Sequence, residues 1–176
     1  KSGIGHTRWA THGTPSVKNA HPHQAGDVAV VHNGIIENFV ELRAELNSYK
    51  IKHKTDTDTE TVALMAKYYL SQGLGPTEVV KKTLLKLKGA FALAFLFQGE
   101  DDLMIVARQG SPLAIGHGNG EMYVGSDAIA LAHLTNKITY LDEGDFAKIT
   151  RKNLEIIDKS GNLVTRKIRN INININ

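Results

Sequence analysis

The spacing of apolar residues changes once along this chain, close to Gly89, and this change restricts the possible folds more than any other feature. Before Gly89, residues 36–48, 57–70 and a third segment that begins at Thr77 carry apolar side chains at helical intervals. After it, short apolar runs alternate with Gly, Asp or Pro, which is typical of strands. Helices followed by an antiparallel meander predict an α+β domain in which helices pack on one or both faces of antiparallel sheets.

Two local signals refine this prediction. A β-branched apolar run at 27–32 predicts a buried strand, and the Asn33-Gly34 pair that follows it predicts a sharp turn. Thr57 and Glu60 have the spacing of a capping box, which predicts that a helix begins at Thr57. The predicted strands cover residues 4–9, 27–32, 91–97, 103–108, 113–116, 121–125, 138–141, 145–149 and 154–158, and a short helix covers 127–134.

Length and composition exclude several classes of protein. A chain of 176 residues favours one domain with a substantial core. Its formal charge is +3, and its Lys and Arg residues are scattered among acidic residues. The sequence therefore has no basic stripe of the kind that binds nucleic acid. No apolar run approaches the roughly 20 residues of a membrane span, and the first residues do not resemble a signal peptide, so we expect no membrane contact and a cytoplasmic location. The sequence contains no cysteine, which excludes disulfides, thiolate metal sites and a cysteine nucleophile within this chain.

The last residues form a separate segment by composition. From Arg169 to Asn176, Ile and Asn alternate in a low-complexity pattern. As a strand this pattern would be an amphipathic edge, but a frayed or foreign tail fits it better. We therefore predict a domain over residues 1–165 and a tail over 166–176.

Polar residues of the types used in binding and catalysis are concentrated in three segments of the sequence. They are residues 6–12 together with the His21-Pro22-His23 sequence, then 32–34, then 55–60. Taken singly, each has a purely structural explanation, such as a surface ion pair, a hairpin turn or helix-capping charges. The histidines lack both the HExxH spacing and cysteine partners, so we assign no metal ligand, although a histidine-rich metal protein stays as an alternative. The co-occurrence of the three segments is what indicates a site.

Together these segments resemble the class II glutamine amidotransferases over about residues 3–165. The resemblance is strongest to the branch that transfers glutamine nitrogen to fructose 6-phosphate, and weaker to amidophosphoribosyltransferases and asparagine synthetases, which share the Asn-Gly pair. The matching sequences are GHTRWATHG at 5–13, NAHPH at 19–23, VHNGIIEN at 31–38, TDTE at 57–60, ARQGSPL at 107–113, GSD at 125–127 and LDEGD at 141–145.

The resemblance implies how glutamine would be bound. Arg8 would bind the α-carboxylate, a task that suits a planar guanidinium, and Thr11 and His12 would add hydrogen bonds. Asp58 would bind the α-ammonium group. The resemblance is to enzymes that need no metal and no organic cofactor, so we expect none.

The resemblance also implies how the amide would react. The side-chain amide of Asn33 and the backbone N–H of Gly34 would stabilise the oxyanion of the tetrahedral intermediate. Trp9 would lie on a mobile loop that shields the site. His6 and His21 would support that loop or serve a structural role alone.

The sequence departs from the family in one decisive respect. The nucleophile of the family is an N-terminal cysteine, and neither Lys1 nor Ser2 replaces it. We therefore expect the four-layer αββα sandwich of N-terminal-nucleophile hydrolases, incomplete at its N-terminal side, and no activity from this chain alone. Fructose 6-phosphate would bind only through sugar-isomerase domains that the chain lacks, and the parent enzyme would be a homodimer. The alternative is a stand-alone, non-catalytic glutamine-binding or vestigial module.

Overall fold

The computed structural model describes residues 1–172, and all three long helices predicted from the sequence are present in it. They are α1 (Phe39–Ser48), α2 (Asp58–Ser71) and α3 (Pro76–Lys86). The first begins three residues later than its predicted start at 36, because Ile36 still belongs to a strand. Within the described residues, no helix is long and apolar enough to cross a membrane.

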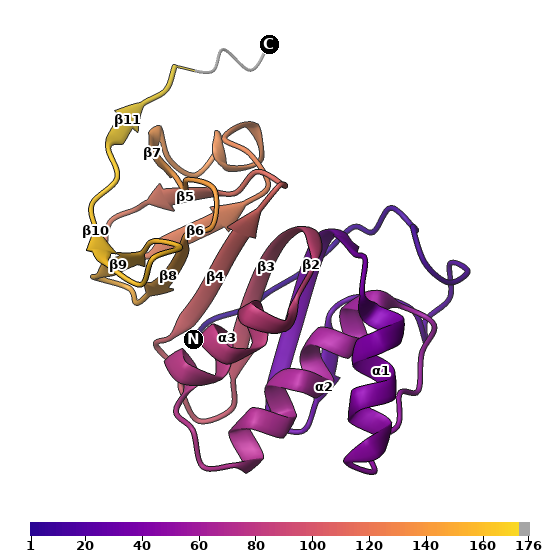
Figure 1. Cartoon of the computed structure of the whole chain (residues 1–176). Coiled ribbons are helices and arrows are strands. Elements are labelled where there is room, and N and C mark those ends of the chain that lie inside the picture. Colours follow the sequence, from indigo (N-terminus) through magenta and orange to yellow (C-terminus); the bar gives the residue numbers. More distant parts are fainter. Residues whose placement is uncertain (173–176) are drawn as a thin grey trace.

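The larger of two sheets forms the centre of the molecule (Figure 1). Its seven strands lie in the order β1-β2-β3-β4-β8-β9-β10, and every neighbouring pair is antiparallel, as the meander predicted. The strands are β1 (His23–Ala25), β2 (Val28–Ile36), β3 (Gly89–Phe97), β4 (Met104–Gln109), β8 (Phe146–Ile149), β9 (Leu154–Ile157) and β10 (Leu163–Val164).

The smaller sheet has four antiparallel strands in the order β11-β7-β5-β6. They are β5 (Ala114–His117), β6 (Met122–Gly125), β7 (Lys137–Tyr140) and β11 (Ile168–Asn170). β11 lies inside the segment predicted as a tail and pairs with β7 at the sheet edge. Residues 173–176, the end of that segment, lie outside the described residues.

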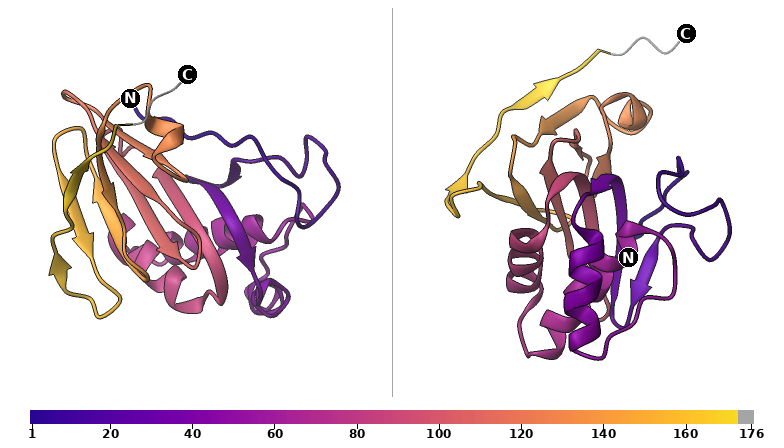
Figure 2. Two further views of the ribbon diagram at one scale, coloured as in Figure 1. Left: turned by 90° about the horizontal axis from the view of Figure 1, so that it is seen from above. Right: turned by 45° about the vertical axis from the view of Figure 1, so that its right-hand side comes forward.

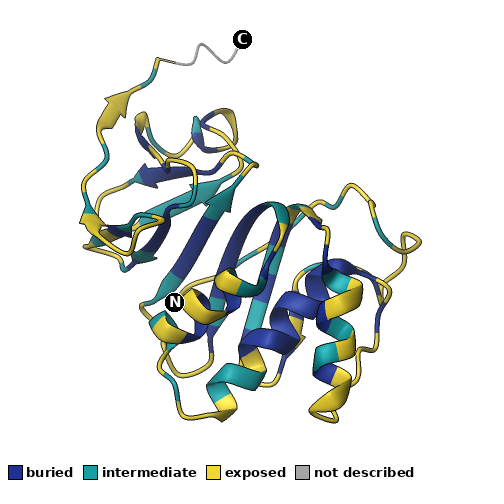
Figure 3. Cartoon of the chain, in the orientation of Figure 1, coloured by how far each residue is buried: buried dark blue, intermediate teal, exposed yellow. Residues whose placement is uncertain are grey.

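Alternation along β3 shows how the layers are held together. Leu93 and Phe95 point into a core that the helices cover, whereas Ala92 and Ala94 point into a second core between the two sheets. The helices lie together on one face of the larger sheet (Figure 2), and the buried residues concentrate along the strands and the inner helix faces (Figure 3). A third, small cluster including Leu131 packs η1 (Ile129–Leu131) on the outer face of the smaller sheet. The chain therefore has an α+β fold. The three helices cover the larger sheet, whereas in the described residues the outer face of the smaller sheet is covered by the short turn η1.

The Asn33-Gly34 pair does not form the predicted turn. β2 continues through it to Ile36, and Gly34 pairs with Phe91 of β3. The positive φ that the pair favours is present, at +117° for Gly34, and a Cβ atom there would lie 2.2 Å from the carbonyl oxygen of Ala90. Glycine is needed at this position because the neighbouring strand approaches too closely for a side chain.

Three further predictions were wrong in detail. Residues 4–9 form no strand, and the helix predicted at 127–134 is reduced to the 3₁₀ turn η1. Thr57 is the N-cap residue of α2, but its side chain makes no capping hydrogen bond. Instead Glu60 accepts the backbone N–H groups of Lys54 and Thr55, both at 2.7 Å, so it orders the segment before the helix.

Candidate functional site

A cavity of about 690 Å³ lies where the N-terminal segment crosses the end of β2 and the start of α2. It is open to solvent and lined by both polar and apolar groups. All nine site residues predicted from the sequence line it: His6, Arg8, Trp9, Thr11, His12, His21, Asn33, Gly34 and Asp58. Residues separated by as many as 52 positions, from His6 to Asp58, therefore meet at one place in the fold.

Asp58 is the buried acid of the cavity, with 3% of its surface exposed. It occupies the first turn of α2, where the helix dipole favours a negative charge. Its Oδ2 accepts the backbone N–H of Ile36 at 2.8 Å, which ties the start of α2 to the end of β2. Its Oδ1 makes no hydrogen bond within residues 1–172, and that oxygen is available to a ligand.

Arg8 is held in place by its own loop. Its guanidinium donates to the carbonyl oxygens of His12, at 2.8 Å, and of Gly13 and Thr14, both at 3.3 Å. Its φ of +50° lies in the left-handed region, which a non-glycine residue rarely adopts. The adjacent Trp9 is 91% exposed, so its ring does not cover the cavity.

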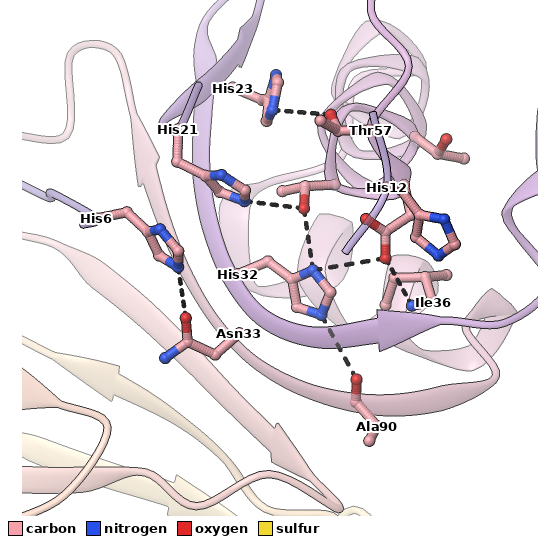
Figure 4. Close-up of polar contacts among 12 residues, drawn as sticks. His6, His12, His21, His23, His32, Asn33, Ile36, Thr57 and Ala90 are labelled. Atoms are coloured by element: carbon pink, nitrogen blue, oxygen red, sulfur yellow. Dashed lines mark hydrogen bonds and ion pairs between the residues drawn. The ribbon is translucent and has the colours of Figure 1, made fainter. Parts of the chain in front are cut away.

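His6 connects this loop to β2. Its Nδ1 accepts the backbone N–H of Arg8 at 2.8 Å, and its Nε2 contacts Oδ1 of Asn33 (Figure 4). The ring also stacks on that of His21, with centroids 4.3 Å apart.

Further contacts involve His23, His32, Thr57 and Thr59, to which the sequence assigned no role in binding or catalysis. The hydroxyl of Thr59 lies 3.0 Å from His21 Nε2 and 3.0 Å from His32 Nδ1, so one side chain of α2 bridges two imidazoles. The hydroxyl of Thr57 lies 2.8 Å from His23 Nε2. All five residues in these contacts fell in segments selected from the sequence, but their spacing carried no signal of these pairs.

Burial keeps the histidines of this network neutral. Desolvation by burial is the main cause that lowers the pKa of His21, to about 3. Desolvation also lowers the pKa of His23 and that of His32, although Glu60 and Asp58 respectively oppose the shift. These rings therefore act as neutral hydrogen-bonding groups near pH 7.

Two ring nitrogens of residues that line the cavity have no protein partner within residues 1–172. Within the described residues, Nε2 of His12 and Nδ1 of His21 are buried without a hydrogen bond. Buried polar atoms are usually satisfied, so both are available to a bound ligand or to water. Within residues 1–172, no group of three or more His, Asp or Glu side chains is placed to hold a metal ion.

The sequence that forms this α+β fold and this cavity matches the model of a known protein family. The chain belongs to the glutamine amidotransferase domain family, whose model matches residues 6–133. It is a class II glutamine amidotransferase domain, as the sequence motifs indicated.

The relatives narrow the comparison to one group of enzymes. The chain is 58% identical over 94% of its length to a glutamine–fructose-6-phosphate aminotransferase (isomerizing) of Bradyrhizobium diazoefficiens. It is 56% identical over 95% of its length to the enzyme of that name from Brucella suis. The chain spans 27% and 28% of these two relatives, about a quarter of their length.

Solved structures support the fold. The glutamine phosphoribosylpyrophosphate amidotransferase from B. subtilis superposes with a TM-score of 0.71 at 29% identity, covering 90% of this chain and 35% of that one. A glutamine aminotransferase class-II domain protein from Silicibacter pomeroyi has a TM-score of 0.56 at 20% identity, covering 81% of this chain and 72% of that one.

Proposed function

We propose that the chain is part of the glutaminase domain of an enzyme that transfers the amide nitrogen of glutamine to fructose 6-phosphate, giving glucosamine 6-phosphate and glutamate. Relatives named for this reaction are 56–58% identical over at least 94% of the chain, which supports the proposal. Since the chain spans about a quarter of their length, the sugar chemistry is assigned to other parts of the enzyme. We also propose the four-layer αββα sandwich for the complete domain and a cytoplasmic location.

One observation carries the assignment of glutamine as ligand. The buried carboxylate of Asp58, whose Oδ1 has no hydrogen bond within residues 1–172, lines the same cavity as Arg8. A buried charge is costly unless a partner neutralises it, so this oxygen calls for a cation. Free glutamine carries an ammonium group for Asp58 and a carboxylate for Arg8.

The arginine keeps donors for that carboxylate. A guanidinium has five N–H groups, and three are used on loop carbonyls, so two remain. Thr11 and His12 also line the cavity, and Nε2 of His12, which has no hydrogen bond within residues 1–172, adds hydrogen-bonding capacity. This set recognises the two charged ends of an α-amino acid.

The reactive end of glutamine is assigned to Asn33 and Gly34. Their N–H groups would stabilise the oxyanion formed when the amide carbonyl is attacked, and removing one such donor costs about 3–4 kcal/mol of transition-state stabilisation. Attack requires a nucleophile, and the family nucleophile is a cysteine, which this sequence does not contain. The nucleophile therefore comes from outside these residues, and we expect the chain alone to bind glutamine without hydrolysing it. Trp9 would close over the bound ligand.

Calorimetry with two ligands tests the binding assignment. L-glutamine should bind, and Asp58→Asn, which keeps an oxygen for Ile36 N–H but loses the charge, should weaken it by about tenfold to a hundredfold. Glutaramic acid, which is glutamine without its α-amino group, should bind wild type and variant equally. Equal loss for both ligands would show that Asp58 acts through structure, and no loss would contradict the proposal.

A second experiment separates the candidate enzymes. The complete enzyme that contains this domain should form glucosamine 6-phosphate from glutamine and fructose 6-phosphate. Formation of phosphoribosylamine from phosphoribosylpyrophosphate would instead favour an amidophosphoribosyltransferase, the class of one structural relative. Glutamine binding with neither product would favour a stand-alone glutamine-binding module.

A further inference from the structure

The imidazole of His6 contacts two groups of the site at once, and each contact restricts where its proton lies. Nδ1 lies 2.8 Å from the backbone nitrogen of Arg8, and Nε2 contacts Oδ1 of Asn33. A backbone N–H can only donate, so Nδ1 must be the unprotonated acceptor. The neutral ring then carries its proton on Nε2, and that proton is donated to Asn33.

This tautomer determines how the amide of Asn33 is oriented. An Nε2–H group needs an acceptor, so the carbonyl oxygen of Asn33 faces His6 and its NH₂ group faces away, as Figure 4 shows. The opposite orientation would place N–H groups against each other. Asn33 is exposed on the cavity side of β2, and no other protein hydrogen bond holds its side chain within residues 1–172.

The position of the His6 ring is itself constrained from two sides. It stacks on His21 at an interplanar angle of 21°, and His21 is hydrogen-bonded to Thr59 of α2. On the other side, the Arg8 N–H that it accepts belongs to a residue in the left-handed region, at φ +50°. The ring therefore joins the arginine loop to β2 and α2.

We propose that His6 is a positioning residue, whose Nε2–H tautomer turns the NH₂ group of Asn33 toward the substrate oxygen and couples that group to the backbone of Arg8. This inference deepens the proposed function, because it presupposes that Asn33 is an oxyanion donor. In the catalytic cycle, the contact would let the loop that binds the α-carboxylate also set the group that stabilises the reacting carbonyl. Such preorganisation lowers the cost of forming the oxyanion.

Nuclear magnetic resonance of the chain without ligand tests the proton position directly. A long-range ¹H–¹⁵N correlation spectrum of the histidine side chains, assigned with His6→Ala, should show His6 with a protonated Nε2 and a bare Nδ1. The opposite tautomer, or rapid exchange between the two, would overturn the proposal. Because no glutamine is present, this result is independent of whether the proposed ligand binds.

Two conservative variants then separate the contacts. In His6→Gln, the side-chain NH₂ reaches about as far as Nε2 and can still donate to Asn33; in His6→Asn, an oxygen replaces Nδ1 for Arg8 but nothing reaches Asn33. We expect the Asn33 side-chain NH₂ resonances to stay near their wild-type positions in His6→Gln and to move in His6→Asn. In the complete enzyme, His6→Asn should lower kcat for glutamine hydrolysis by at least tenfold with little change in KM, and His6→Gln should restore most of it. Equal kcat in the two variants would overturn the proposal.

Discussion

Arg166 binds the buried carboxylate of Asp145 through two parallel hydrogen bonds, Nε to Oδ2 at 2.9 Å and Nη2 to Oδ1 at 2.8 Å. Only 1% of the Asp145 surface is exposed, and its Oδ2 also accepts the backbone N–H of Asp142. The pair joins the chain after β10 to the loop before β8. Arg166 is the first residue of the segment predicted as a tail. The beginning of that segment is therefore bound to the domain through Asp145.

Replacing Asp145 with Asn should therefore destabilise the domain. One N–H group of the new amide would face the guanidinium and a charge-assisted hydrogen bond would be lost, so we expect the free energy of unfolding to fall by about 2–3 kcal/mol. Urea denaturation followed by circular dichroism measures this change. Asp102→Asn is the matched control, because Asp102 pairs with Arg151 at the surface, where such pairs contribute little. Similar effects of the two variants would contradict the structural role of Asp145.

The second prediction concerns the close approach of β3 to Gly34. Comparing alanine variants at Gly34 and Gly73 separates the cost of a steric clash from the cost of a positive φ. Gly34→Ala adds a Cβ 2.2 Å from the carbonyl oxygen of Ala90, so β2 and β3 must move apart, and we expect a loss above about 3 kcal/mol. Gly73→Ala has a similarly positive φ, +84°, but nothing within 4 Å of the added atom, and should cost about 1 kcal/mol. Thermal and urea unfolding of both variants measure the difference. If the two losses were equal, the close approach of β3 would not matter.

Glu60 tests the contacts that replace the predicted capping box. Its two carboxylate oxygens accept the N–H groups of Lys54 and Thr55, both at 2.7 Å, in a buried position. Glu60→Gln puts an NH₂ group against one of these donors, and we expect a loss of about 1–3 kcal/mol. Glu78→Gln, in the first turn of α3, is the control for loss of an acidic residue near a helix N-terminus. Faster hydrogen exchange at the Lys54 and Thr55 amides would accompany the loss only in Glu60→Gln.

The sequence predicted the helices and most strands because their apolar periodicity agrees with the final packing. β3 is an example: its run of apolar residues is buried on both faces, between the helices and the smaller sheet. The Asn33-Gly34 prediction failed because local turn preference competes with pairing to β3, and the pairing extends to Ile36. Thr57 failed as a capping side chain because its hydroxyl bonds His23, 34 residues away.

The site was predicted residue by residue from its motifs, but not as a set of contacts. The motifs selected His6, His21 and Asn33, whereas the hydrogen bond from His6 to Asn33 and the bridge through Thr59 join positions 27 or more apart. No period or spacing in the sequence encodes such pairs, since they depend on how the N-terminal segment crosses β2 and α2. The protonation state of His21 likewise follows from its burial, which only the fold determines.

That burial leads to a prediction about acid stability. Desolvation lowers the pKa of His21 from 6.5 to about 3 in the folded state, and it lowers the pKa of His23 and of His32 in the same direction. Below about pH 6.5 the unfolded chain therefore binds protons that the folded chain does not, so the free energy of unfolding falls as the pH falls. The stabilising effect is fully present above pH 6.5 and, for His21, is lost progressively toward pH 3.

We expect the Tm to decrease between pH 7 and pH 5, a window above the ordinary pKa range of carboxylates. His21→Gln should flatten this decrease, whereas substitution of the exposed His53 should leave it unchanged. A Tm profile that is the same for wild type and His21→Gln would mean that His21 does not remain neutral in the folded protein.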